Sequence, residues 1–382
     1  MPKSTCGRTP AMTFREMNRA VFAGEHIPHV FFQPRFEPWY DWQLRAGLMP
    51  EAYRELGMIG TYDTLGCSIR YVHYYTGMPD PIVRHFSPPV RVSVHEHGHR
   101  RSVVYETPAG ELVEEQQFTT DETWRTVGFP VKDADDLRVL RSLYGHTSYS
   151  FSAERFKQGS DFIAGRGEPQ FWVPKSPYQA LAQWWMRLED LIYALADCPT
   201  EVEQTMRAID DSYDGLYEEL AGSSIIHIIN FGENIHDQLF SPRYFERYLI
   251  PWYEKRAGQM RSGGIYTDMH LDGNFGALLK YLAHLPFDGL EALTPEPQGD
   301  VSIEQMREHL GDKILLDGIP AILFLPHYSM DQFTECVERL VELFHPRLVL
   351  GVSDEVPQGA EATEAIDRIR MVSEWCKGHG TR

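Results

Sequence analysis

The chain has 382 residues, of which 42% are hydrophobic, and its formal net charge is −19. This composition supplies enough apolar side chains for a sizeable core, and the acidic charge disfavours binding to nucleic acid or to an anionic membrane surface. No apolar run approaches the roughly 18–20 residues that a membrane-spanning helix requires.

The cysteines and the N-terminus indicate the compartment. The five cysteines are scattered and show no Cys-x-x-Cys spacing, which argues against a disulfide framework and against a thiolate zinc site. The first residues read MPKSTCGRTPAMTF and lack the apolar segment of a secretory signal. We therefore expect a cytoplasmic protein.

The first predicted elements are a short helix and an apolar stretch. Residues 13–24 favour a helix, so we assign residues 1–24 to an N-terminal helical extension. The apolar stretch covers residues 26–33, and a segment rich in aromatic residues and proline follows at 34–47. That last segment predicts a loop and a short helix.

Residues 90–118 alternate with a period of two and contain turn sequences, which predicts an inserted β-hairpin or small meander. His95, His97 and His99 share one face there. We interpret them as a solvated hairpin tip, because no carboxylate or thiol completes a set of metal ligands.

From about residue 135 onwards, helices alternate with short apolar strands. Residues 171–199 predict the end of a strand and then one long amphipathic helix. The alternation is typical of right-handed βαβ units and a parallel sheet, in which ligands bind at the C-terminal ends of the strands. The clearest predicted strands are 224–232, 264–270, 287–293, 313–318 and 348–353, and the predicted helices are 241–261, 275–284, 302–310, 329–345 and 360–377.

Polar residues follow successive predicted strands. Carboxylates and imidazoles that meet at one rim form either a cation site or a proton-transfer site. The alternative is that these loops are simply polar and that the acids cap helices. The residues are Glu233, Asn234, His236, Asp268, His270, Asp272, Glu296, Gln298, Asp354 and Glu355.

Residues 12–377 resemble the uroporphyrinogen decarboxylase-like superfamily. The segments that carry the resemblance include HVFFQPRFEPWYDW, GFPVKDADDLRVL, MHLDGNFGALLKYL, LEALTPEPQGDVSIEQMREHLGDKILLDGIP and LGVSDEVPQGAEATEAIDRI. The resemblance implies a (β/α)8 TIM barrel, which we expect over residues 25–378 as a single domain. The superfamily also contains zinc-dependent methyltransferases and the catalytic barrel of cobalamin-independent methionine synthase.

The sequence His-x-Asp-Gly at 270–273 is similar to the His-x-Cys-Gly of the methyltransferase branch, whose His and Cys bind zinc. The decarboxylase proper carries an Arg-Gln-Ala-Gly-Arg signature near its N-terminus. Here that region reads FQPRFEP, so only Arg35 corresponds to it. The resemblance is therefore to the methyltransferase branch.

The resemblance also implies a ligand set, in which His270 matches the first zinc ligand and Asp272 stands where the first cysteine does. Glu296 lies near the position of a methionine synthase glutamate. The last cysteine falls at Ser353 or Asp354, of which Asp354 can bind a metal. Because oxygen replaces every thiolate, the site would be harder, and Zn²⁺, Mn²⁺, Fe²⁺ or no metal are all compatible with it. A hard cation would polarise an ether or phenolate oxygen.

If this set is real, the carboxylates of Glu296 and Asp354 should lie within about 5 Å of the His270 ring, with Glu355 pointing away. The same segment, DMHLDG, also fits the Asp-x-His-x-x-Gly motif of cobalt-ligating corrinoid domains. The companion features of that motif are missing. We therefore favour a separate corrinoid protein that docks over the barrel mouth.

Aromatic residues near the expected mouth favour a small aromatic or corrin-like ligand, although ordinary core packing is the alternative. We assign substrate binding to Arg35, Trp39, Tyr75 and Asn234. No phosphate loop, dinucleotide fingerprint or nucleophile elbow is present.

The leading hypothesis is a metal-assisted methyltransferase that takes a methyl group from a small O-methylated donor to a corrinoid protein. Glu233, His236 and Asp268 are its expected catalytic residues. The second hypothesis is a decarboxylase of an aromatic or tetrapyrrole-like acid, with Arg35 binding a carboxylate and Asp272 or His270 steering the proton. The third is a corrinoid or porphyrin carrier. A homodimer is compatible with each.

Overall fold

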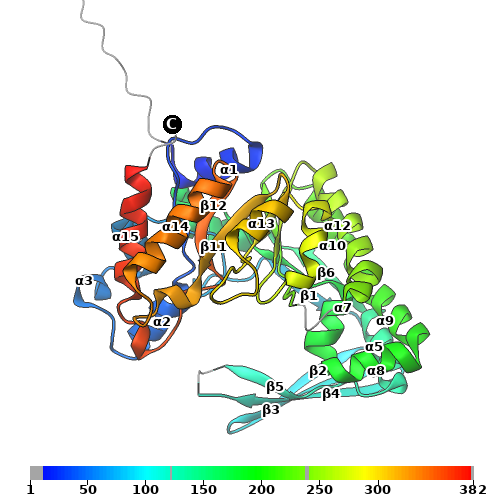
Figure 1. Cartoon of the computed structure of the whole chain (residues 1–382). Coiled ribbons are helices and arrows are strands. Elements are labelled where there is room, and N and C mark those ends of the chain that lie inside the picture. Colours follow the sequence, from blue (N-terminus) through cyan, green and yellow to red (C-terminus); the bar gives the residue numbers. More distant parts are fainter. Residues whose placement is uncertain (1–11, 121–122, 237–240, 380–382) are drawn as a thin grey trace, which may run out of the picture.

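The computed structural model describes residues 12–120, 123–236 and 241–379 (Figure 1). The strands are β1 (Ile82–Phe86), β2 (Arg91–His97), β3 (Arg100–Thr107), β4 (Gly110–Phe118), β5 (Trp124–Gly128), β6 (Thr147–Phe151), β7 (Trp172–Val173), β8 (Ile228–Phe231), β9 (Tyr266–His270), β10 (Gly289–Glu291), β11 (Ile314–Pro320) and β12 (Leu348–Ser353). The helices are α1 (Phe14–Ala23), α2 (Glu37–Arg45), α3 (Glu51–Arg54), α4 (Gly57–Leu65), α5 (Ala134–Tyr144), α6 (Ala153–Ile163), α7 (Pro177–Ala180), α8 (Leu188–Asp197), α9 (Pro199–Asp211), α10 (Asp214–Ala221), α11 (Pro242–Tyr244), α12 (Ile250–Ser262), α13 (Ile303–Leu310), α14 (Met330–Phe344) and α15 (Ala365–Gly378).

Strands β7 to β12 form a six-stranded parallel sheet in the order β12-β11-β10-β9-β8-β7. Every residue of β8, β10, β11 and β12 is buried. Such continuous burial is typical of parallel strands that are covered on both faces. The alternation of strands and helices therefore predicts the mixed α/β architecture correctly.

Two short extended segments lie at the edges of this sheet. Phe32 forms a parallel bridge with Leu350 of β12, and Tyr71 forms one with Gln170 next to β7. The amide of Ser68 donates to the carbonyl of Phe32 at 2.9 Å and so connects the two segments. These contacts add a short extended segment to each edge of the six-stranded sheet.

Helix α1 covers the N-terminal ends of the parallel strands. Its apolar face lies in a buried cluster with Ile228, Ile314 and Val349, which stand at or near the starts of β8, β11 and β12. Thr13 and Glu16 form a capping box at its first turn. Because α1 occupies this end, the opposite end of the strands is the one left to bind ligands.

The sequence of α14 explains its position on the sheet. Ser329 caps the helix, and Gln332 returns the hydrogen bond. Apolar residues at helical spacing form the buried face that packs on β11 and β12. They are Phe333, Cys336, Val337, Leu340 and Phe344.

The prediction of one long helix within 171–199 is wrong. Helix α7 continues into a π turn at Leu181–Trp185 and ends at Met186, whose backbone is extended, and α8 begins at Leu188. The break lets Trp185 pack against Tyr105 and Tyr144, with ring centroids 5.3 and 5.8 Å away. Tertiary packing thus overrides the local helical pattern.

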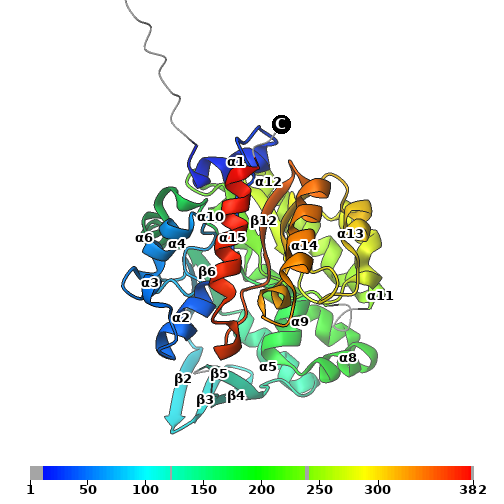
Figure 2. The same cartoon turned by 60° about the vertical axis from the view of Figure 1, so that its left-hand side comes forward.

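Strands β2 to β5 form a separate antiparallel sheet, which in Figures 1 and 2 lies at the opposite end of the molecule from α1. It occupies the region where the sequence predicts a hairpin, and β5 is an additional strand. The side chains of β2 are exposed along its whole length. Strand β1 instead pairs with β6.

Candidate functional site

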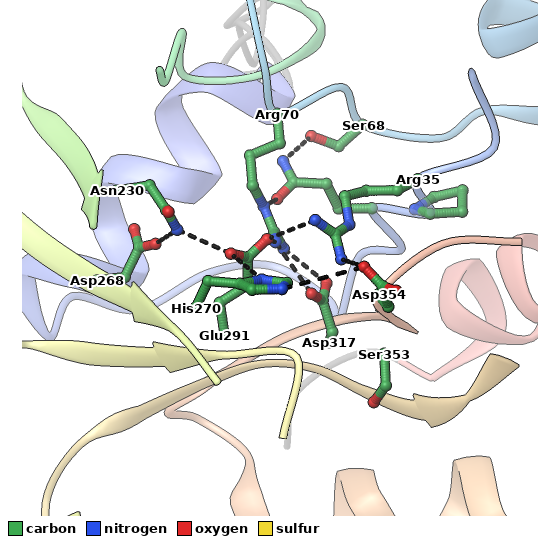
Figure 3. Close-up of polar contacts among 12 residues, drawn as sticks. Arg35, Ser68, Arg70, Asn230, Asp268, His270, Glu291, Asp317, Ser353 and Asp354 are labelled. Atoms are coloured by element: carbon green, nitrogen blue, oxygen red, sulfur yellow. Dashed lines mark hydrogen bonds and ion pairs between the residues drawn. The ribbon is translucent and has the colours of Figure 1, made fainter. Parts of the chain in front are cut away.

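The C-terminal ends of the parallel strands carry a layer of buried polar side chains (Figure 3). Asp268 and His270 belong to β9, and Glu291 is the last residue of β10. The strand register places His270 beside Glu291, and Asp268 beside Asn230 of β8. All four residues are at most 8% exposed.

Two buried arginines hold the carboxylates of this layer. Arg70 donates to Glu291 at 2.5 Å and to the two oxygens of Asp317 at 3.0 and 2.7 Å. Arg35 lies 3.3 Å from Glu291 and 3.1 Å from Asp354. Burial alone would raise the pKa of Glu291, but Arg35 and Arg70 hold that pKa well below its usual range. Glu291 is therefore a carboxylate at neutral pH.

His270 is fixed by Glu291, because its Nδ1 lies 3.0 Å from Glu291 Oε2. Its Nε2 faces Asp272 Oδ1 at 3.8 Å and Asp354 Oδ1 at 4.0 Å. Burial would lower the pKa of His270, but the charge and hydrogen bond of Glu291 outweigh burial and raise it. The site therefore favours a protonated imidazole whose Nε2 is not engaged in a close contact with a carboxylate.

Three residues in or directly after the neighbouring strands β10, β11 and β12 have a strained backbone. Ala292, Asp317 and Asp354 have φ angles of 62°, 78° and 67°, in the left-handed region that non-glycine residues rarely adopt. Each such residue costs on the order of 1–3 kcal/mol. Two of these residues, Ala292 and Asp354, directly follow β10 and β12, and Asp317 lies within β11 and belongs to the charged layer.

The described residues do not fit the divalent-metal site that the resemblance implies. Around His270, only Asp272 and Asp354 of the expected carboxylates approach, and Arg35 already binds Asp354. Within the described ranges, no group of three or more His, Cys, Asp or Glu side chains could hold a metal ion. Glu296 lines a different cavity, with Cys336 and Arg339, and within the described ranges no ion pair joins it to His270.

Asp354 and its neighbours follow the expected orientation. Asp354 faces Arg35 and His270, whereas Ser353 is buried and donates to the carbonyl of Leu293 at 3.0 Å. Glu355 accepts a hydrogen bond from Tyr74 instead of contacting His270.

Two of the expected catalytic residues are enclosed in the protein. Glu233 accepts hydrogen bonds from the amide and hydroxyl of Ser176 at 2.6 and 2.7 Å and from Tyr253 at 3.0 Å. Asp268 accepts from Asn230, and burial raises its pKa well above the usual value. Neither residue lines the cavity described below, so neither is placed to contact a ligand there.

The other predicted residues divide between the core, the surface and the site. Trp39 is fully buried and donates to the carbonyl of Ala362 at 2.7 Å, so it is a core residue. Tyr75 is 43% exposed and does not line the cavity. The ring of His236 lies against Gly273, where an added Cβ would approach its Cδ2 to 2.4 Å. Asn234 lines the cavity, and its role in substrate binding stays a prediction.

A cavity of about 460 Å³ opens beside His270, within the range of small-molecule sites. Its wall combines aromatic rings with cationic side chains. The lining residues are Arg35, His73, Tyr74, Asp80, Ile82, Arg84, Tyr149, Trp172, Val173, Pro174, Lys175, Trp184, Gly232, Asn234, His270 and Asp354.

Sequence reasoning missed Arg70, Glu291 and Asp317. Glu291 and Asp317 stand inside the predicted strands 287–293 and 313–318, whereas the sequence assigned no element to the segment around Arg70. A charged residue within a buried strand needs a partner of opposite charge, so the presence of two such residues was itself a signal. Arg84 and Lys175, which line the cavity, were also missed.

Comparison with known proteins identifies the fold of this chain but no family. No protein-family model matches the chain, and no curated protein matches its sequence. The chain is similar to the solved structure of a methyltransferase from Methanosarcina mazei, with a TM-score of 0.55 and 13% identity over 94% of this chain and 98% of that chain. It is also similar to a B12-independent methionine synthase from Shewanella sp., with 9% identity over 86% and 91% of the two chains, but that TM-score is only 0.38. At such identities the likeness to the methyltransferase establishes a shared architecture alone.

Proposed function

We propose that the protein is a methyltransferase that takes a methyl group from a small O-methylated aromatic donor and passes it to a corrinoid on a separate protein. The observation that carries this proposal is His270, which is held by buried Glu291 and lines a cavity with aromatic walls. The similar fold of a methyltransferase gives further support. The proposal includes a closed eight-stranded barrel and a cytoplasmic location.

The chemistry requires a proton at the oxygen that leaves. The methyl group moves to cobalt(I) of the acceptor, whose electron pair forms the new carbon–cobalt bond and which becomes cobalt(III). The electron pair of the broken C–O bond stays on oxygen, and His270 Nε2 protonates that oxygen. General acid catalysis of this kind typically contributes about 10²- to 10⁴-fold to a rate. Since the described donor set does not fit a metal, no step is routed through one.

A decarboxylase of an aromatic acid is the second candidate. The observation that favours it is the set of three basic side chains in the cavity wall, Arg35, Arg84 and Lys175, because these could bind a carboxylate. In that reaction His270 would protonate the carbon from which carbon dioxide leaves.

The test is an assay with free cob(I)alamin as acceptor and a panel of methoxylated aromatic compounds as donors. We expect methylcobalamin and the matching phenol in equal amounts, and a rate at least about 100-fold lower in His270→Gln. His309 is half-buried and, among the described residues, its side chain bonds to the carbonyl of Gln305 in its own helix, so His309→Gln provides the matched control. Carbon dioxide release without methylcobalamin would replace the proposal with the second candidate.

A further inference from the structure

Arg84 stands at the centre of β1 and is paired with Tyr149 on β6. Its side chain lines the same cavity as His270. Its Nε and Nη2 atoms are buried and have no hydrogen-bond partner among the described residues. No carboxylate of the described ranges forms an ion pair with it, although Asp80 lines the same cavity and instead accepts from the amide of Ile82 at 2.8 Å.

By contrast, the buried arginines of the described chain all have oxygen partners. Arg70 binds two carboxylates, Arg35 lies against two, and Arg256 binds Asp210 at 2.5 Å. Arg368 donates to two backbone carbonyls. Since leaving a buried charge without a partner is costly, the exception at Arg84 calls for a ligand that supplies the missing acceptor.

Aromatic rings hold the guanidinium of Arg84 in place. It lies 4.7 Å from the ring centroid of Phe86, 5.4 Å from Tyr144, 5.5 Å from Trp185 and 5.9 Å from Tyr149. Cation–π contacts of this kind stabilise the charge, but the ring faces do not replace the in-plane acceptors that the N–H groups prefer. The rings therefore orient the guanidinium, but its Nε and Nη2 atoms still lack hydrogen-bond acceptors.

The charges around the cavity favour an anion despite the acidic charge of the whole chain. Of the three basic residues in its wall, Arg35 is neutralised by Asp354 at 3.1 Å. Lys175 donates to two neutral oxygens, the carbonyl of Gly232 and the side chain of Asn234. Trp172 and Tyr74 supply flat apolar surface in the same wall.

We propose that Arg84 binds the carboxylate of the substrate, so that the methyl donor is a single-ring aromatic carboxylic acid with its ether oxygen directed to His270. This inference rests on the proposed function for the role of the ether oxygen, but the carboxylate subsite can be tested without any methyl transfer.

The experiment is a calorimetric titration of the whole protein with meta-methoxybenzoate and with the neutral meta-methoxybenzamide. We expect the benzoate to bind at least about ten-fold more tightly than the benzamide. In Arg84→Met the affinity for the benzoate should fall at least about ten-fold, while the affinity for the benzamide is unchanged. Arg84→Lys should recover part of the lost affinity for the benzoate. Arg101→Gln is the matched control, since Arg101 also lies over an aromatic ring, Trp124 at 4.5 Å, but does not line the cavity.

A stability measurement separates binding from a structural role. Because Arg84→Met removes a half-buried charge whose Nε and Nη2 atoms are buried without partners, we expect its melting temperature to be unchanged or raised. A lowered melting temperature with undiminished benzoate binding would overturn the proposal. Equal affinity of the wild type for benzoate and benzamide would overturn it as well. Tight benzoate binding without methyl transfer would instead refute the proposed reaction and leave the subsite standing.

Discussion

At the scale of single residues, the contact with Glu291 holds the ring of His270 and favours its protonated form. Glu291 stays ionised because two arginines contact it, and it in turn raises the pKa of His270. The sequence identified His270, Asp272 and Asp354 as neighbours, because short motifs at strand ends reveal such residues. It did not identify Glu291, whose role depends on partners about 220 residues earlier in the chain, as its bond to Arg70 shows.

The pH dependence of activity tests this pair. A general acid is active while it is protonated, so the rate should fall as the pH rises through the raised pKa of His270. Glu291→Gln removes the charge that raises this pKa, and the alkaline limb should move to lower pH. Asp272→Asn, which removes a weaker influence on the same ring, should move it less. An alkaline limb that stays in place in Glu291→Gln would contradict the assignment of His270 as the acid.

The buried ion pairs of Arg70 should contribute more to the stability of the fold than ion pairs at the surface. Arg70→Met leaves Glu291 and Asp317 with less compensation in the core, and breaking a buried pair in this way costs about 3–5 kcal/mol. Arg339→Gln removes an exposed arginine that pairs with Glu304 and Glu342, and should leave stability unchanged. Urea unfolding measures the free energy of unfolding of both variants. Equal losses in the two variants would refute the stabilising role of the buried ion pairs.

Metal content tests the ligand set expected from the sequence. Asp354 already forms an ion pair with Arg35, and Glu296 lines another cavity. We therefore expect the purified protein to contain less than one equivalent of zinc. Its activity should survive dialysis against a chelator. A full equivalent of metal that disappears when His270 and Asp272 are both changed to Ala would restore the original prediction.

At the scale of elements, strand and helix periodicity predicted the C-terminal half well. The expected strands at 264–270, 313–318 and 348–353 correspond to β9, β11 and β12. The long helix failed because the packing of Trp185 interrupts it, and a local pattern contains no information about that packing. The segment expected to be a helix at 275–284 forms 3₁₀ turns instead, at Gly276–His284.

The close packing of β12 on β11 depends on Gly351. An added Cβ there would lie 2.2 Å from Asp317 Oδ1 and 2.8 Å from the carbonyl of Gln33. Gly351→Ala should therefore destabilise the fold by at least about 1–3 kcal/mol and displace the partner of Arg70. Gly258→Ala on α12 meets no atom within 4 Å and should stabilise by about 0.5–1 kcal/mol. Chemical denaturation compares them, and a neutral Gly351→Ala would contradict the packing described.

At the scale of the whole molecule, the acidic chain surrounds a cavity with basic side chains in its wall. Helix α1 covers the N-terminal ends of the parallel strands, so the functional end is the opposite one, as βαβ topology predicts. No helix within the described ranges is long and apolar enough to cross a bilayer. The architecture was predictable because periodicity and connection rules determine it. The composition of the cavity was not, because β1 precedes the region of alternating strands and helices, and β6 pairs with β1 in an antiparallel manner instead of joining the parallel sheet.

The central claim is that the methyl group, and not the carboxyl group, leaves the donor. The most direct measurement uses meta-methoxybenzoate labelled with a heavy carbon isotope either in its methyl or in its carboxyl carbon, together with cob(I)alamin. We predict that the methyl label appears in methylcobalamin and that the carboxyl label remains in the phenolic product, and that methyl transfer is at least about 100-fold slower in His270→Gln. Carboxyl label released as carbon dioxide, with the methyl label still on the ring oxygen, would contradict the account.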